Sequence, residues 1–106
     1  MIDSKKIEEV VSRIATQFNP EKIILFGSYA SGTYNNDSDL DLLIVQETEL
    51  PRHKRAYEIR LSLIGTMIPI DILIYTNAEF NAEKNKRFSF LNSAIKNSKI
   101  LYERGD

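Results

Sequence analysis

Two aspartates stand two residues apart in the segment 39–46, and a third, Asp71, stands inside another apolar run. Both runs predict β-strands, whose side chains alternate between the two faces of a sheet. Asp39 and Asp41 are therefore expected to share one face, with Cα atoms about 6–7 Å apart. Aspartate is depleted in strands and is rarely buried without a partner. Because two such charges repel, either this face is open to water or a cation lies between the carboxylates.

Mg²⁺ suits such a position because it prefers hard oxygen ligands, commonly one or two carboxylates together with substrate phosphates. A solvent-facing strand end is the alternative explanation for a lone Asp-x-Asp pair. The nearby Asp71 and the loop that precedes Asp39 favour the metal.

That loop begins with Gly27-Ser28 directly after the apolar run 22–26, and Gly32 follows. Glycine permits a sharp turn and a close approach of backbone to a ligand. A helical turn that starts at Ser28 would present unpaired N–H groups to a phosphate. Taken alone, the loop also fits an ordinary Gly/Ser turn. Together with Asp39 and Asp41 it describes one site, in which the loop holds a phosphate chain and the carboxylates hold the bridging metal.

The remaining periodicity predicts the elements that position these side chains. Apolar residues spaced three and four apart indicate helices, and short apolar runs indicate strands. The expected elements are helices over 4–18, 52–66 and most of 77–103, one helical turn within 27–37, strands over 22–26, 39–46 and 69–75, and a short edge strand over 99–102. This order predicts an α/β (α+β) fold, a small mixed β-sheet with helices packed against it.

The composition narrows the class of protein further. The chain has 106 residues, 42% of them hydrophobic, no cysteine and a formal net charge of −1. This length predicts a single domain over residues 1–106, with a core that needs no disulfide. The balanced charge disfavours nucleic-acid binding through a basic surface, and no segment is apolar enough to cross a membrane. We therefore expect a small cytoplasmic domain whose chemistry uses no thiolate.

The glycine loop and the segment Ser38-Asp39-Leu40-Asp41-Leu42-Leu43 resemble the signature of the polymerase-beta-type nucleotidyltransferase superfamily. The length resembles its smallest branch, the minimal nucleotidyltransferases, and the resemblance extends over nearly the whole chain. Many members carry Arg just before the second loop glycine, where this chain has Ser31. That difference removes a cation from near the phosphates and leaves the carboxylates intact.

The resemblance implies a nucleotidyltransferase fold, ATP as substrate and two Mg²⁺ ions. Such a pair of metals, about 3.5–4 Å apart, can clamp an in-line displacement at the α-phosphorus of a nucleotide. The third carboxylate completes the metal site and helps to activate the attacking hydroxyl. By this match the catalytic and metal-binding residues are Asp39, Asp41 and Asp71, and the nucleotide-binding residues are Gly27, Ser28 and Gly32.

The resemblance also implies a protein acceptor, because larger relatives carry a second domain for the acceptor and 106 residues leave no room for one. Minimal nucleotidyltransferases are commonly paired with a HEPN toxin, whose tyrosine receives AMP from ATP. The implied function is that of a protein adenylyltransferase acting as the antitoxin, in a hetero-oligomer with its partner. One alternative is an antitoxin that neutralises its partner by binding alone. The other is nucleotidyl transfer to a small molecule or to an RNA end.

Aromatic and basic residues near the C-terminus allow two interpretations. Three phenylalanines are expected in the core or at an interface, and a basic cluster is typical of a solvated helix face. Docking of a partner or of further phosphates is the alternative for the basic cluster. The residues are Phe80, Phe88 and Phe90, and Lys84, Lys86 and Arg87.

Overall fold

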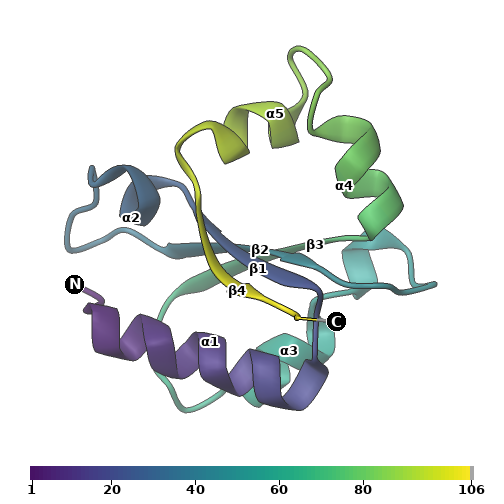
Figure 1. The fold of residues 1–106 in the computed structure, drawn as a ribbon. Coiled ribbons are helices and arrows are strands. Elements are labelled where there is room, and N and C mark those ends of the chain that lie inside the picture. The colour runs from purple at the N-terminus through teal and green to yellow at the C-terminus, as the bar shows by residue number, and fades with distance from the viewer. Residues whose placement is uncertain (106) are drawn as a thin grey trace.

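A four-stranded sheet forms the middle layer of the molecule, with helices on both faces (Figure 1). The structure is a computed structural model that describes residues 1–105. One face carries helices α1 (Ser4–Phe18) and α3 (Tyr57–Ser62), and the other carries α4 (Asn77–Glu83) and α5 (Phe90–Ala94). The remaining elements are β1 (Lys22–Phe26), α2 (Ser28–Ser31), β2 (Leu40–Val45), η1 (Arg52–Lys54), β3 (Ile70–Tyr75), η2 (Ile95–Asn97) and β4 (Lys99–Glu103).

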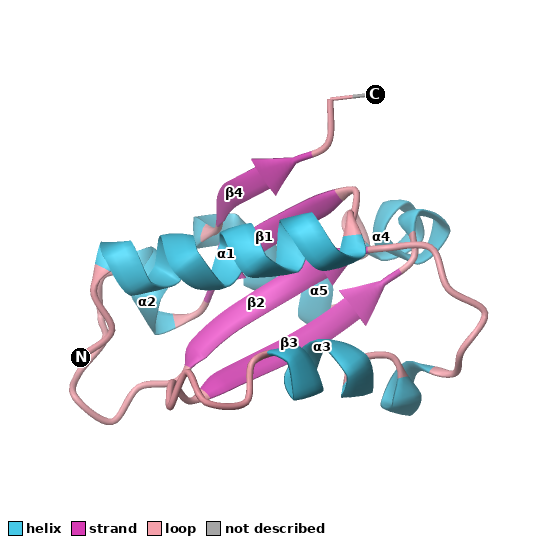
Figure 2. Ribbon diagram, turned by 90° about the horizontal axis from the view of Figure 1, so that it is seen from below, coloured by secondary structure: helices cyan, strands magenta, loops and turns pink. Residues whose placement is uncertain are grey.

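The sheet is mixed, in the order β3-β2-β1-β4. Strand β1 runs antiparallel to both β2 and β4, whereas β2 and β3 are parallel (Figure 2). The predicted class, a small mixed sheet with helices packed against it, is confirmed. Within residues 1–105, no helix is both long and apolar enough to cross a bilayer.

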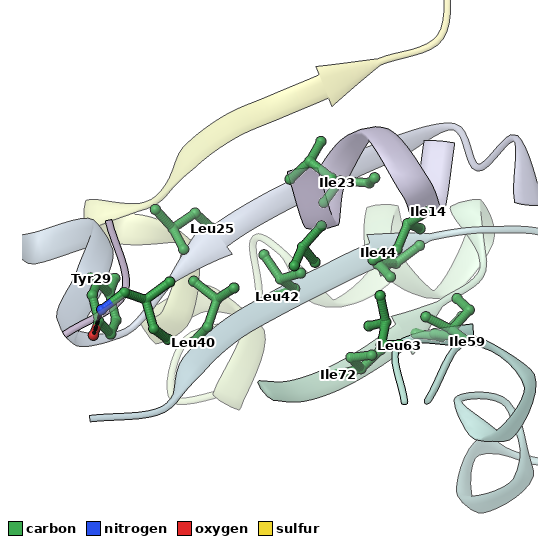
Figure 3. Close-up of a cluster of buried hydrophobic side chains, with 14 of the residues drawn as sticks. Ile14, Ile23, Leu25, Tyr29, Leu40, Leu42, Ile44, Ile59, Leu63 and Ile72 are labelled. Atoms are coloured by element: carbon green, nitrogen blue, oxygen red, sulfur yellow. Dashed lines mark hydrogen bonds between the residues drawn. The ribbon is translucent and has the colours of Figure 1, made fainter. Parts of the chain in front are cut away.

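Each face of the sheet packs its own hydrophobic cluster. Alternate residues of β2 divide between them, with Leu40, Leu42 and Ile44 facing α1 and α3. Figure 3 shows this first cluster, in which the side chains of β1, β2 and β3 meet those of the two helices. Leu43 and Val45 face α4 and α5 in the second cluster. By the same alternation, Asp41 belongs to the face that α4 and α5 cover.

The predicted first helix, 4–18, and first strand, 22–26, match the structure at both ends. An Asp3 carboxylate oxygen accepts a hydrogen bond from the Lys6 N–H at 2.9 Å and caps α1. Asn19 ends the helix in the left-handed region, at φ 46°. The helical turn in the glycine loop and the edge strand near the C-terminus are also confirmed, as α2 and β4.

The prediction of one helix over 52–66 is wrong, because the segment contains only η1 and the short α3. Its first turn carries Arg52 and Lys54, whose positive charges oppose the helix dipole at an N-terminus. Near its end, the hydroxyl of Thr66 donates to the Leu63 carbonyl at 2.8 Å and competes with backbone pairing. The helix predicted over most of 77–103 is likewise divided, into α4, α5 and η2.

A nearly buried arginine fastens the connection after β2 to α4. The Arg55 side chain is 9% exposed, and it donates to both carboxylate oxygens of Glu79, at 2.6 and 3.1 Å. It also donates to the carbonyls of Leu50 and Ile74. The hydrogen bonds from Arg55 and from the Thr76 N–H lower the pKa of Glu79 to about 2.

We expect Glu79→Gln to lower the free energy of unfolding at pH 7 by about 1–2 kcal/mol, because charge-assisted bonds to Arg55 become neutral ones. The folded-state pKa of Glu79 lies near 2, below the ordinary 4.5. Its contribution is therefore present above about pH 5 and is lost as the pH falls toward 2. Thermal melts of both proteins between pH 7 and pH 3 should show a difference in Tm that shrinks with acid. A difference that stays constant would contradict this assignment.

Candidate functional site

Two of the predicted aspartates lie side by side at one end of the sheet. Asp41 of β2 pairs in register with Asp71 of β3 on one side and with Phe26 of β1 on the other. Neighbouring strands are about 4.8 Å apart, so the two carboxylates leave the same face of the sheet as close neighbours. In Figure 2 the starts of β2 and β3 lie next to each other at this end.

Asp39 lies just before the strand rather than inside it, because β2 begins at Leu40. The prediction that the strand starts at Asp39 is therefore wrong by one residue. Asp39 is exposed, and its charge still acts on Asp41.

Electrostatics mark Asp41 as the central member of this carboxylate group. Burial raises the pKa of Asp41 above its usual value, and the negative charges of Asp71 and Asp39 raise it further. Asp71, like Asp39, is exposed. Three carboxylates thus concentrate negative charge at one end of the sheet, where a cation would relieve their repulsion.

The glycine loop passes directly over the Asp41 carboxylate. Gly27 adopts φ 74° and ψ −155°, a conformation that residues with a side chain rarely adopt. A Cβ built on Gly27 would stand 3.0 Å from Cγ of Asp41 and would collide with its Oδ2. Glycine is therefore required here twice, by backbone conformation and by space. This contact joins the loop and the carboxylates, which the sequence treats as separate motifs.

Helix α2 holds the loop in place through its buried side. Tyr29 and Ala30 belong to the first hydrophobic cluster, and the Tyr29 hydroxyl accepts a hydrogen bond from the Ile2 N–H at 3.0 Å. Gly32 ends the turn at φ 83°, and its N–H donates to the Ser28 carbonyl at 2.9 Å. Within the described residues, the N–H groups of Ser28 and Tyr29 meet no protein acceptor. The loop thus presents donors at the end of β1.

Ser31 lies directly before Gly32, at the position where the sequence resemblance would lead us to expect Arg. Its hydroxyl lies 2.9 Å from that of Thr33 and 3.5 Å from the Ser28 carbonyl. The side chain is therefore engaged within the loop itself.

The carboxylates fit a divalent cation by the chemistry of their donors. Carboxylate oxygens are hard ligands that Mg²⁺ prefers, and the repulsion that raises the pKa of Asp41 is what a cation would relieve. Within residues 1–105, no three carboxylate or histidine side chains converge closely on one point. Asp39, Asp41 and Asp71 are thus neighbours on one surface rather than a closed cage.

A protein-family model described as "Nucleotidyltransferase domain" matches residues 4–97. The chain belongs to this nucleotidyltransferase family. It is 32% identical over 107 residues to the protein named "Putative protein adenylyltransferase MJ0604" of Methanocaldococcus jannaschii, an alignment that covers 96% of this chain and 100% of that protein. A second protein of that organism, "Putative protein adenylyltransferase MJ0141", is 41% identical over 54 residues, which cover 51% of this chain and 54% of that protein.

Solved structures share the nucleotidyltransferase fold. The crystal structure of a "putative nucleotidyltransferase" from Sulfolobus solfataricus superposes with a TM-score of 0.66 at 24% identity, covering 94% of this chain and 79% of that one. A crystal structure of a toxin–antitoxin with AMP-PNP superposes with a TM-score of 0.62 at 20% identity, covering 92% and 73%. The predicted resemblance to a minimal nucleotidyltransferase is confirmed, and this chain is a nucleotidyltransferase enzyme.

Two aromatic residues lie beside Asp41, a position that the sequence did not predict for either of them. Phe26 pairs with Asp41 across the sheet, and the Phe90 ring of α5 stands edge-on to the Phe26 ring, with centroids 6.0 Å apart. The alternation of side chains along β1 could have assigned Phe26 to the same face of the sheet as Asp41. The position of Phe90 depends on how α5 packs on that face, which no local sequence pattern predicts. These rings form one wall beside the nucleotidyltransferase carboxylates.

Proposed function

We propose that this nucleotidyltransferase is a Mg²⁺-dependent protein adenylyltransferase that moves AMP from ATP to a tyrosine hydroxyl of a partner protein. The observation that carries the proposal is the contact of Gly27 with the Asp41 carboxylate, beside Asp71. It joins a phosphate-binding loop to a cluster of metal-type ligands. The full-length similarity to a named protein adenylyltransferase supports a protein as the acceptor.

In this proposal the carboxylates and the glycine loop have different tasks. Asp39, Asp41 and Asp71 would hold Mg²⁺, which would neutralise phosphate charge and acidify the acceptor hydroxyl. Gly27 and Ser28 position the phosphates through the free N–H groups of the loop. Gly32 ends the helical turn of that loop. Asp71 takes the proton of the attacking hydroxyl. The tyrosine oxygen bonds to the α-phosphorus, the bond from the α-phosphorus to its bridging oxygen breaks, and pyrophosphate leaves.

We further propose that residues 1–106 act as a single cytoplasmic domain, the antitoxin of a pair whose toxin is a HEPN protein. The shared fold with a toxin–antitoxin structure that contains AMP-PNP supports the comparison at the level of architecture. Adenylation of the toxin would then silence it within a hetero-oligomer.

Intact-mass spectrometry tests this function directly. The purified chain, ATP and Mg²⁺ are incubated with the proposed HEPN partner, and the mass of each protein is measured. We expect an adenylate increment on a tyrosine of that partner, which disappears when Mg²⁺ is chelated. A partner that stays unmodified after incubation with folded enzyme that binds ATP would refute the proposal.

The position of Ser31 favours one competing function, neutralisation of the partner by binding alone. Its hydroxyl is engaged inside the loop and adds no cation for the phosphates. If binding alone neutralises the toxin, the Asp39→Asn variant should inhibit it as well as the wild-type protein does. If adenylation neutralises the toxin, the variant should no longer inhibit it. A toxin-activity assay with both proteins therefore separates the two functions.

A further inference from the structure

A basic and aromatic surface lies on the face of the sheet that carries Asp41, formed by Lys84, Lys86, Arg87, Phe88 and Phe90 in the turn after α4 and the start of α5 (Figure 1). Phe88 is 94% exposed and Phe90 is 56% exposed. This surface connects to the site through rings, because Phe90 packs edge-on against Phe26, the cross-strand neighbour of Asp41.

The backbone holds Phe88 outward at a cost in free energy. Its φ of 66° lies in the left-handed region, which a bulky residue seldom occupies. Hydrogen bonds fix the turn around it: the Ser89 hydroxyl donates to the Glu83 carbonyl at 2.9 Å, and the Asn92 amide donates to the Lys84 carbonyl at 2.9 Å. These bonds keep the Phe88 ring directed into solvent although its backbone is strained.

The cations of this surface lack carboxylate partners. Among residues 1–105, neither lysine nor Arg87 lies within ion-pair distance of an Asp or Glu. Arg87 lies over the Phe88 ring, 5.6 Å from its centroid, and Lys84 lies near the Phe80 ring. Unpaired cations around exposed rings complement a ligand that is both acidic and apolar.

We propose that this surface docks an acidic segment of the acceptor protein and so brings its tyrosine to the carboxylates. The inference rests on the proposed adenylyltransferase function and adds the chemistry by which the acceptor is recognised. A protein segment is favoured over RNA because a net charge of −1 for the chain and a cluster of three cations give little attraction for a polyanion.

Two fluorescein-labelled peptides serve as probes, each with a tyrosine and leucines, one flanked by glutamates and the other by lysines. Fluorescence anisotropy should show the acidic peptide binding at least about tenfold more tightly than the basic one. The double variant Lys86→Glu/Arg87→Glu should bind the basic peptide more tightly than the acidic one. Added salt should weaken the preference of the wild-type protein for the acidic peptide. Equal binding of the two peptides, or no effect of the charge reversal, would overturn the proposal.

Phe88→Gly separates the role of the ring from the fold. Glycine relieves the strain at φ 66°, so Tm should rise by a few degrees. Loss of the ring should nevertheless weaken binding of the acidic peptide by about tenfold, the effect expected when an aromatic contact residue is removed. Met67→Gly is the matched control, because Met67 is also 94% exposed at φ 58° but lies in the turn between α3 and β3. It should raise Tm without changing peptide affinity, and an equal loss of affinity in both variants would overturn the proposal.

Three further arms keep this inference distinct from the proposed function. If the acidic peptide binds but the proposed HEPN partner is never adenylated, the adenylyltransferase function fails and the docking surface stands. If both peptides are adenylated at equal rates, the function stands and the docking surface fails. A single-stranded RNA oligonucleotide that binds more tightly than the acidic peptide, or a change of the ATP KM in Phe88→Gly, would assign the surface to another ligand and overturn the proposal.

Discussion

Replacing Asp41 with Asn should lower the rate of nucleotidyl transfer by about a thousandfold, while the protein melts at the same temperature or higher. A bound metal supplies several kcal/mol of charge stabilisation in the transition state, and about 4 kcal/mol corresponds to a factor of a thousand. Asp41 lies at the centre of the three carboxylates and touches the backbone of Gly27. The substitution therefore removes a proposed metal ligand at the point where the glycine loop approaches the carboxylates.

The expected gain in stability follows from the pKa of Asp41. Burial and the charges of Asp71 and Asp39 raise this pKa in the folded protein. The ionised carboxylate therefore destabilises the fold at pH 7, and the penalty fades as the pH falls and the group takes up its proton. The Tm of Asp41→Asn should exceed that of the wild type at pH 7, and the two should converge in acid.

Single-turnover rates with ATP and Mg²⁺ measure the catalytic effect. Asp37→Asn is the control. Asp37 is an exposed carboxylate in the loop that precedes β2, and it does not belong to the group formed by Asp39, Asp41 and Asp71. This variant should leave the rate within a factor of about two. An Asp41→Asn enzyme that keeps a tenth or more of the wild-type rate would contradict the assignment of Asp41.

Gly27→Ala should lose about a hundredfold in transfer rate and several degrees in Tm. The new Cβ would collide with Oδ2 of Asp41, and alanine is strained at φ 74°. A left-handed backbone costs a residue with a side chain about 1–2 kcal/mol, which lowers Tm by several degrees in a domain of this size. Displacement of catalytic groups by about 1 Å costs a further hundredfold in rate.

Gly65→Ala separates backbone strain from collision with the site. Gly65 has φ 99°, and a Cβ built there meets no atom within 4 Å. This variant should lose stability as Gly27→Ala does but keep its transfer rate. If both variants retain full activity, the loop does not depend on the close approach of Gly27 to Asp41.

Local patterns predicted much of the fold because they carry their own physical signal. The helix 4–18 has an apolar stripe, a capping aspartate and a left-handed end, and strand 22–26 is a continuous apolar run. The helix over 52–66 was predicted wrongly because apolar spacing carries no information on cationic first turns or on competing hydroxyls.

The arrangement of the site depends on contacts that no local pattern contains. Alternation assigns Asp41 and Asp71 to faces of their strands, but only the parallel pairing of β2 with β3 makes them neighbours. The approach of Gly27 to Asp41 likewise follows from the position of β1 beside β2. Phe80 is buried as predicted for a core residue, whereas Phe88 is almost fully exposed because the turn after α4 directs it into water.

Transfer of label from ATP to the acceptor tests the central claim most directly. Parallel reactions contain the enzyme, the proposed HEPN partner, Mg²⁺ and ATP that is radiolabelled at either the α- or the γ-phosphate. Attack at the α-phosphorus predicts that the partner takes up label from the α-phosphate alone, and that Asp41→Asn abolishes this uptake. Label entering from the γ-phosphate, or undiminished uptake with Asp41→Asn, would contradict a nucleotidyl transfer that depends on these carboxylates.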